Sequence, residues 1–296
     1  TTSMRCYNCS LEFGKDYYKY TDDCETYLLI GTDGSGNENA NDESYKGAMA
    51  DFLLLIVFNK TDNKYGFIQI DRDTICDVTE IESDGSGEGM ESLQICTSHW
   101  YGKDKEQSAE NTVTSVSLLL GELDIDGYYV IGMDNIGIIN DLVGGVKVTV
   151  EDDFGEESSL VKGEEINLSN EQAEEYLRGR MGVGDGENRS RMRRQRTYME
   201  GFLEKVKNMI NEDPSVVDGL LEGVSNISTT NINNNKISKI VNFVSKMDSE
   251  GIETFDGEVK TGSRLGDGLM HTEFYPDRES MIQIMTKLYD LEIDNE

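Results

Sequence analysis

Arginine is concentrated in one short segment of this chain. Seven of the eleven arginines lie between Arg178 and Arg196, in a protein whose formal net charge is -31. A guanidinium stays charged at any working pH, and its planar fork matches a pair of phosphate oxygens. An acidic protein that gathers its arginine in one place is therefore predicted to bind a specific anion there.

Spacing within this segment selects a smaller group of side chains. Arg191, Arg194 and Gln195 are related by i, i+3 and i+4, which places them on one face of a helix near its N-terminus. Helix N-termini favour anions. The alternative is a solvated arginine face that pairs with the nearby acidic residues, and spacing alone leaves both interpretations open.

Carboxylates mark the ends of three predicted strands. Asp33 follows the first strand and Asp51 precedes the second, while Arg72 and Asp73 follow the third. If neighbouring strands bring these ends together, two carboxylates and an arginine face one crevice, with oxygen ligands for Mg²⁺ and a cation for phosphate. The three strands are expected at 27–30, 52–58 and 65–70.

The remaining pattern indicates a layered α/β domain. Strands at 128–131 and 146–150 enclose a helix at 135–142. From Ser169 onward helices dominate, and Ser169 with Gln172 reads as a capping box. Asn63-Lys64 suits a hairpin turn. Loops are expected at 34–47 and 83–89, and further helices at 111–120, 191–210, 236–247 and 278–291.

Composition excludes several classes of protein. A pI near 4.3 argues against general nucleic-acid binding and against electrostatic adhesion to anionic lipid. No apolar run is long enough to span a membrane, and no signal peptide is visible. The two histidines lack a nucleophile elbow, and no phosphate-binding glycine loop follows a strand. The residues around Asp71 do not complete a calcium loop.

Cysteine usage leaves the redox state open. The chain has five cysteines, and Cys6 and Cys9 have C-x-x-C spacing without a second pair to complete a zinc site. Disulfides are possible outside the cell, with no connectivity fixed by the sequence. The odd number leaves at least one thiol unpaired within the chain.

Five collinear segments carry a resemblance to a known family. They include Leu28-Leu-Ile-Gly-Thr-Asp33, Ala50-Asp51 with the apolar run after it, and Ile68-Gln-Ile-Asp-Arg72-Asp73-Thr74. Leu142-Val-Gly-Gly-Val146 follows, and then 168–180 with Arg191-Met-Arg-Arg194-Gln195. Together they cover about residues 27–205 and resemble the LytR-CpsA-Psr family of cell-wall glycopolymer transferases.

The resemblance implies a fold and a location. It implies a three-layer α/β/α fold with a central mixed β-sheet between helices. Residues 1–24 would form a polar juxtamembrane segment, and 25–296 a single catalytic domain onto which the helices after about 210 pack. The protein would act on the extracytoplasmic face of the membrane of a Gram-positive-type bacterium. An N-terminal membrane helix is expected to precede Thr1.

The resemblance also implies an activity and a site. Members move a glycopolymer, such as teichoic acid or capsule, from a polyprenyl-pyrophosphate carrier onto a hydroxyl of peptidoglycan. By position, Asp33 and Asp51 would hold Mg²⁺, and Asp73 would act as base or orient the acceptor. Helices around 111–142 and 198–210 are predicted to line a prenyl channel. The pyrophosphate would be bound by Arg72, Arg178 and Arg180, with Arg191, Arg194 and Gln195 completing the pocket.

The chain departs from the family pattern at three positions. Met49 stands where the family has an arginine, Asp71 where it has a proline, and Asn188 where it has an acid. Lys46 could replace the missing cation. Two alternatives therefore accompany the transferase: a protein that captures polyprenyl-pyrophosphate lipids without turnover, and a pyrophosphatase that uses water as acceptor.

Overall fold

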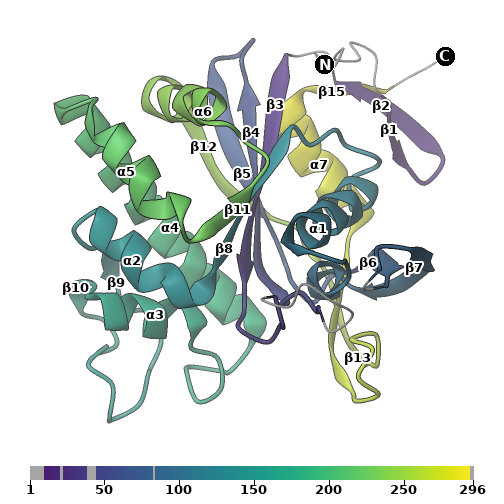
Figure 1. The fold of residues 1–296 in the computed structure, drawn as a ribbon, viewed down its shortest axis with the longest axis horizontal. Helices are drawn as coiled ribbons and strands as arrows, with labels where there is room; N and C mark the ends of the chain where they lie inside the picture. The colour runs from purple at the N-terminus through teal and green to yellow at the C-terminus, as the bar shows by residue number, and fades with distance from the viewer. Residues whose placement is uncertain (1–9, 21–22, 39–44, 83, 294–296) are drawn as a thin grey trace. The chain divides into compact units, whose positions relative to one another are not determined.

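The central sheet of the protein is mixed and is flanked by helices, as the sequence predicts (Figure 1). The structure is a computed structural model that describes residues 10–20, 23–38, 45–82 and 84–293. The sheet order is β11-β8-β3-β4-β5-β12. The strands are β3 (Cys24–Thr32), β4 (Ala50–Asn59), β5 (Lys64–Ile70), β8 (Gly127–Gly132), β11 (Ser228–Thr230) and β12 (Asp248–Thr254).

The β4–β5 hairpin sets the register that matters for the site. The two strands are antiparallel with Leu53 opposite Ile70, so the start of β4 lies beside the end of β5. Asn63 adopts a positive φ of 56° at the connection, which confirms the predicted hairpin turn. β12 runs parallel to β5, which makes the sheet mixed.

The chain packs as two compact units. The first comprises residues 1–30, 35–130 and 247–296, and the second comprises 31–34 and 131–246. The single domain expected at 25–296 stays a prediction. None of the helices in the described part of the chain is both long and apolar enough to cross a membrane.

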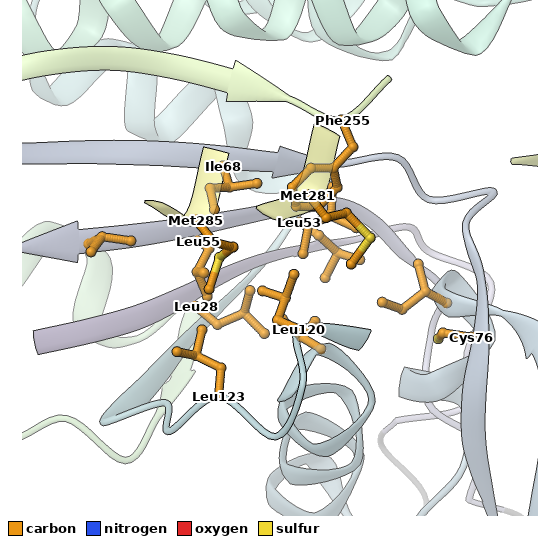
Figure 2. Close-up of a cluster of buried hydrophobic side chains, with 14 of the residues drawn as sticks. Leu28, Leu53, Leu55, Ile68, Cys76, Leu120, Leu123, Phe255, Met281 and Met285 are labelled. Atoms are coloured by element: carbon orange, nitrogen blue, oxygen red, sulfur yellow. The ribbon is translucent and has the colours of Figure 1, made fainter. Parts of the chain in front are cut away.

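The first unit has a dense apolar core against one face of the sheet. Figure 2 shows Leu28, Leu53, Leu55 and Ile68 of the sheet converging with Met285. Each buried aliphatic side chain of this size contributes about 1.5–3 kcal/mol relative to an exposed one. The helices of this core are α1 (Lys105–Leu119) and α7 (Arg278–Tyr289).

Several elements of the first unit were not predicted. Two paired strands, β6 and β7, surround the loop expected at 83–89, whose last residues, 87–89, already belong to β7, and a 3₁₀ helix, η1, follows them. Further small sheets are β1-β2-β15 and β13-β14. The bounds are β1 (Ser10–Phe13), β2 (Asp16–Tyr20), β6 (Ile75–Ile81), β7 (Gly87–Gln94), η1 (Ile95–Trp100), β13 (Gly257–Gly262), β14 (His271–Pro276) and β15 (Leu291–Ile293).

The start of α1 was predicted six residues too late because its inward face is polar. The helix begins at Lys105, where the Asp104 side chain accepts a hydrogen bond from the Gln107 amide. Its buried residues include Asn111, Thr112 and others that break an apolar period. Periodicity alone therefore detected only its second half.

The second unit is mainly helical. Its core gathers buried apolar residues such as Val146, Tyr176 and Tyr198. The predicted capping box of Ser169 and Gln172 is confirmed. The elements are η2 (Met133–Asn135), α2 (Ile136–Leu142), β9 (Lys147–Thr149), β10 (Glu165–Asn167), α3 (Asn170–Arg178), α4 (Asn188–Glu212), α5 (Val216–Ser225) and α6 (Asn234–Lys246).

Candidate anion-binding site

The hairpin register brings Asp51 and Arg72 together, as their positions at strand ends predict. Nη1 of Arg72 donates a hydrogen bond to Oδ1 of Asp51, and the two side chains are only 10% and 11% exposed. Oδ1 of Asp73 lies 3.4 Å from Nε of Arg72. We call Asp51, Arg72 and Asp73 the strand-end cluster.

Two sulfur atoms hold the other end of the Arg72 guanidinium. Nη2 lies 3.2 Å from Sδ of Met49 and 3.1 Å from Sγ of Cys96. The sequence pointed to Met49 only as a lost cation and gave Cys96 no role. Sulfur is a weak acceptor, so these contacts orient Nη2 without cancelling its charge.

A tight turn presents Arg72 to this environment. Oδ1 of Asp71 accepts a hydrogen bond of 2.9 Å from the Asp73 amide, and the Thr74 amide donates to the Asp71 carbonyl at 3.0 Å. Asp71 thus forms the turn through its side chain, in place of the expected proline. The Arg72 carbonyl accepts from the Cys96 amide at 3.2 Å, which fixes the turn against η1.

Burial and neighbouring charges change the pKa of Arg72 and that of Cys96. Burial alone would lower the pKa of Arg72, but Cys96, Asp51 and Asp73 raise it above its ordinary value. Burial raises the pKa of the Cys96 thiol to about 12, although Arg72 acts to lower it. At neutral pH Arg72 is therefore cationic, and the Cys96 thiol beside it is neutral.

The segment before β4 packs closely on η1. The Gly47 amide donates to the Trp100 carbonyl at 3.1 Å, and Nδ1 of His99 lies 2.9 Å from the Ala48 carbonyl. A Cβ at Gly47 would lie 1.8 Å from the His99 carbonyl, so this position requires glycine. Nζ of Lys46 lies 4.1 Å from the centre of the Trp100 ring. His99 thus has a structural contact, and Lys46 a cation–π contact.

In the second unit, Arg194 holds the end of α3. Its side chain is 1% exposed. Its Nε donates to the Tyr176 carbonyl at 2.9 Å, and Nη2 donates to the Gly179 carbonyl. Nη1 pairs with Asp152, and the guanidinium lies over Phe154 at 5.3 Å. These contacts satisfy carbonyls at a helix C-terminus, so Arg194 holds the end of α3, and its assignment to the pyrophosphate pocket stays a prediction.

Arg191 and Gln195 are buried beside it on α4. Nε and Nη2 of Arg191 donate to Oδ1 of Asn188 at 3.1 and 2.7 Å. Asn188, which stands at an acidic position of the family pattern, holds this guanidinium with a neutral oxygen. Nε2 of Gln195 donates to the Leu177 carbonyl at 3.4 Å.

Arg178 and Arg180 are the accessible arginines of the predicted pyrophosphate group. Arg178 ends α3 and is 40% exposed, with Nη1 donating to Glu174 at 2.8 Å. Arg180 is half-buried, and its Nε has no hydrogen-bond partner among the described residues. A phosphate oxygen would supply the acceptor that this buried donor lacks.

Arg193, another arginine of the 178–196 segment, fits the alternative of a solvated face that pairs with nearby acidic residues. Arg193 pairs with Glu151 at 2.6 Å and with Asp152 at 2.7 Å. Asp152 therefore contacts both Arg193 and Arg194. Sequence reasoning missed Asp152, because it lies about forty positions from its partners with no motif to connect them.

The predicted metal ligands, Asp33 and Asp51, lie at strand ends. Asp33 directly follows β3, and Asp51 is the second residue of β4. Among the described residues, no group of three or more acidic, histidine or cysteine side chains is arranged to hold a metal ion. Mg²⁺ is commonly held by one or two carboxylates and substrate phosphates, and the assignment of Asp33 and Asp51 to Mg²⁺ stays a prediction.

The helices at the end of the second unit leave apolar side chains half-buried. No residue of α5 is fully buried, although its sequence is rich in valine and leucine. In α6 only Val244 is buried, and Phe202 and Val206 of α4 are partly buried. We call α4, α5 and α6 the apolar helix layer, and its half-buried side chains suit a hydrophobic ligand. The part of the channel expected from α1 is not supported, because Val116 of α1 lies in the packed core of the first unit.

Comparison with known proteins gives one family. The model of the LytR_cpsA_psr family matches residues 9–289. The polyisoprenyl-teichoic acid–peptidoglycan teichoic acid transferase TagU of Bacillus cereus (strain AH820) is 28% identical over 178 residues, which are 60% of this chain and 51% of TagU. The match thus spans about half the length of this relative.

Solved structures share the fold. Protein gbs0355 of Streptococcus agalactiae has a TM-score of 0.70 at 21% identity, covering 92% of this chain and 90% of that one. TagT of B. subtilis has a TM-score of 0.63 at 18% identity, covering 94% and 93%. A structure of TagT bound to LIIa-WTA is also similar, with a TM-score of 0.63 at 17% identity, covering 94% of this chain and 92% of that one.

Proposed function

The chain belongs to the LytR_cpsA_psr family, and from this membership we propose that it transfers a glycopolymer from a polyprenyl-diphosphate carrier to a hydroxyl of peptidoglycan. The TagU relative, named a teichoic acid transferase, supports an anionic glycopolymer of the teichoic acid class as the cargo. The proposed reaction takes place on the extracytoplasmic face of the membrane.

The observation that carries this proposal is the strand-end cluster. Arg72 is a buried cation, and one end of its guanidinium contacts only neutral sulfur. Asp51 and Asp73 compensate this charge, but sulfur is a weak acceptor that leaves Nη2 without a strong hydrogen bond. A diphosphate oxygen would supply Nη2 with a stronger acceptor, in a charge-assisted hydrogen bond.

Each residue then has a role in phosphoryl transfer. Arg72, Arg178, Arg180 and Arg191 are assigned to the binding of phosphate oxygens. Asp73 accepts the proton of the acceptor hydroxyl. The hydroxyl oxygen forms a bond to the phosphorus that carries the glycopolymer, and the bond from that phosphorus to the bridging oxygen breaks. Polyprenyl phosphate leaves with the electron pair, and the arginines neutralise its charge.

Magnesium and the lipid tail complete the proposal. Asp33 and Asp51 would hold Mg²⁺, which when bound neutralises phosphate charge during the transfer. The apolar helix layer of α4, α5 and α6 would bind the prenyl chain, whose burial stabilises the complex by about 0.8 kcal/mol per CH₂.

A transfer assay tests the proposal. The protein is incubated with a short-chain polyprenyl-diphosphoryl sugar and a peptidoglycan oligomer, with and without Mg²⁺, and the products are identified by mass spectrometry. Sugar phosphate attached to the oligomer only when metal is present is the expected result. Intact lipid that remains bound without any product would instead establish the lipid-binding alternative, and sugar phosphate released to water would establish the pyrophosphatase.

A further inference from the structure

We propose that Met49 and Cys96 are positioning residues that keep Arg72 available for the diphosphate. This inference rests on the proposed function. Among the groups that contact the Arg72 guanidinium, Asp51 and Asp73 are acidic, and Met49 and Cys96 meet Nη2 through sulfur. We call Sδ of Met49 and Sγ of Cys96 the sulfur pair.

The sulfur pair acts against a competing arrangement. With carboxylates on both sides, the guanidinium could rotate and form a bidentate ion pair, which is the strongest contact that arginine makes with a carboxylate. Such a pair would use the same donors that a diphosphate needs. The two sulfur contacts hold Nη2 away from the carboxylates with neutral and weak acceptors. An incoming phosphate oxygen therefore has to displace only these two weak contacts.

The Cys96 sulfur is itself held in a fixed direction. Its thiol donates a hydrogen bond to Oε1 of Gln94 at 3.7 Å, and Nε2 of Gln94 donates to the Thr272 carbonyl at 2.7 Å. Because the thiol proton goes to Gln94, the sulfur lone pairs are left for Nη2 of Arg72. A chain of hydrogen bonds therefore runs from the Thr272 carbonyl in β14 through Gln94 and Cys96 to the guanidinium of Arg72.

Met49 also avoids a second positive charge beside Arg72. The family resemblance places an arginine at this position, and a second cation there would repel Arg72. The thioether is neutral and polarisable, and it fits around a guanidinium without a fixed hydrogen-bond geometry. The strand-end cluster of this chain therefore presents one well-oriented cation, Arg72.

The test compares variants in their affinity for geranylgeranyl diphosphate, measured by calorimetric titration. Cys96→Ala and Met49→Leu remove one sulfur acceptor each, and we expect each to weaken binding by about threefold to tenfold, the effect of one weak hydrogen bond. Cys96→Ser restores an acceptor of nearly the same shape and should recover part of the loss. In the transfer assay the loss should raise KM and leave kcat nearly unchanged.

Cys76→Ala is the matched control. Cys76 is another buried thiol of the first unit, and no hydrogen bond connects it with Arg72 among the described residues. Cys76→Ala should lose stability, as Cys96→Ala should, but it should bind the diphosphate with wild-type affinity. Met49 is only half-buried, so Met49→Leu tests the inference even if the cysteine variants unfold.

The outcomes separate the inference from the proposed function. Wild-type protein that binds the diphosphate, together with unchanged affinity in Cys96→Ala and Met49→Leu, overturns the inference alone. Equal weakening in Cys76→Ala overturns it too, because the effect would then follow stability. Wild-type protein that binds geranylgeraniol and geranylgeranyl diphosphate equally would overturn the proposed function, and the inference with it.

Discussion

Arg72 in the first unit and Arg194 in the second are both buried guanidiniums, and their surroundings differ in kind. Arg194 donates to two backbone carbonyls and to Asp152, all of which need its hydrogen bonds. Arg72 has one close carboxylate, and its Nη2 end meets only sulfur. Arg194 therefore holds the fold, whereas Arg72 keeps donors that a stronger acceptor can take.

The density of arginine in a segment is therefore a poor guide to the residue that binds an anion. The arginine-rich segment between Arg178 and Arg196 is unusual in an acidic chain. Its most buried member serves the end of α3, and Arg193 is paired on the surface. The acceptors around a guanidinium, more than the number of its neighbours, indicate whether an anion can bind.

The largest effect is expected on stability at Arg194. Arg194→Ala leaves the Tyr176 and Gly179 carbonyls without this donor and Asp152 with one partner fewer. We expect a loss of about 3 kcal/mol in the free energy of unfolding, measured by chemical denaturation. A loss below about 1 kcal/mol would show that Arg194 does not hold the end of α3.

The next effect is expected on turnover at Arg72. Arg72→Lys keeps the charge but loses the planar fork, so it cannot hold Asp51 and a phosphate oxygen together. We expect kcat/KM in the transfer assay to fall at least about 100-fold. Circular dichroism checks that the variant is folded. Activity within about twofold of wild type would remove Arg72 from the site.

A smaller effect is expected at the exposed end of α3. Arg178→Ala and Arg180→Ala should each lower turnover by at least about tenfold, with little change in unfolding. Glu174→Gln serves as the control, because it breaks only the surface pair with Arg178 and should change stability by less than about 0.5 kcal/mol. Wild-type rates in both arginine variants would end their assignment to phosphate binding.

Ionisation of the Cys96 thiol is expected to have the smallest effect on stability near neutral pH. Its pKa rises from 9.0 to about 12 on folding, mainly through burial. Below pH 9 the thiol is protonated in both states, and above it the unfolded chain loses the proton first, so stability falls between about pH 9 and pH 12. Cys96→Ser should lose less stability over this range in alkaline denaturation. Identical profiles would show that the thiol ionises normally.

Sequence alone predicted much of the framework. The apolar runs in β3, β4 and β5, rich in leucine, isoleucine and aromatic residues, predicted the central strands and with them the Asp51–Arg72 contact. The capping box located α3 because its signal is local. The fold and the strand-end cluster follow from these few segments.

The rest depended on contacts that sequence does not reveal. Cys96 reaches Arg72 from η1, after a β6–β7 hairpin whose turn read only as a loop. Asp152 meets Arg194 across forty-two positions. Cys6 and Cys9, which raised the question of a metal or a disulfide, lie outside the described residues. Long-range polar contacts have no period, so neither spacing nor hydropathy predicts them.

The most direct test of the account is the affinity of Arg72→Gln for geranylgeranyl diphosphate beside that of wild type. Glutamine keeps a polar side chain in the pocket but carries no charge. The account predicts a dissociation constant at least about 100-fold higher, with geranylgeraniol binding unchanged. Equal affinities of the folded variant and wild type for the diphosphate would contradict it.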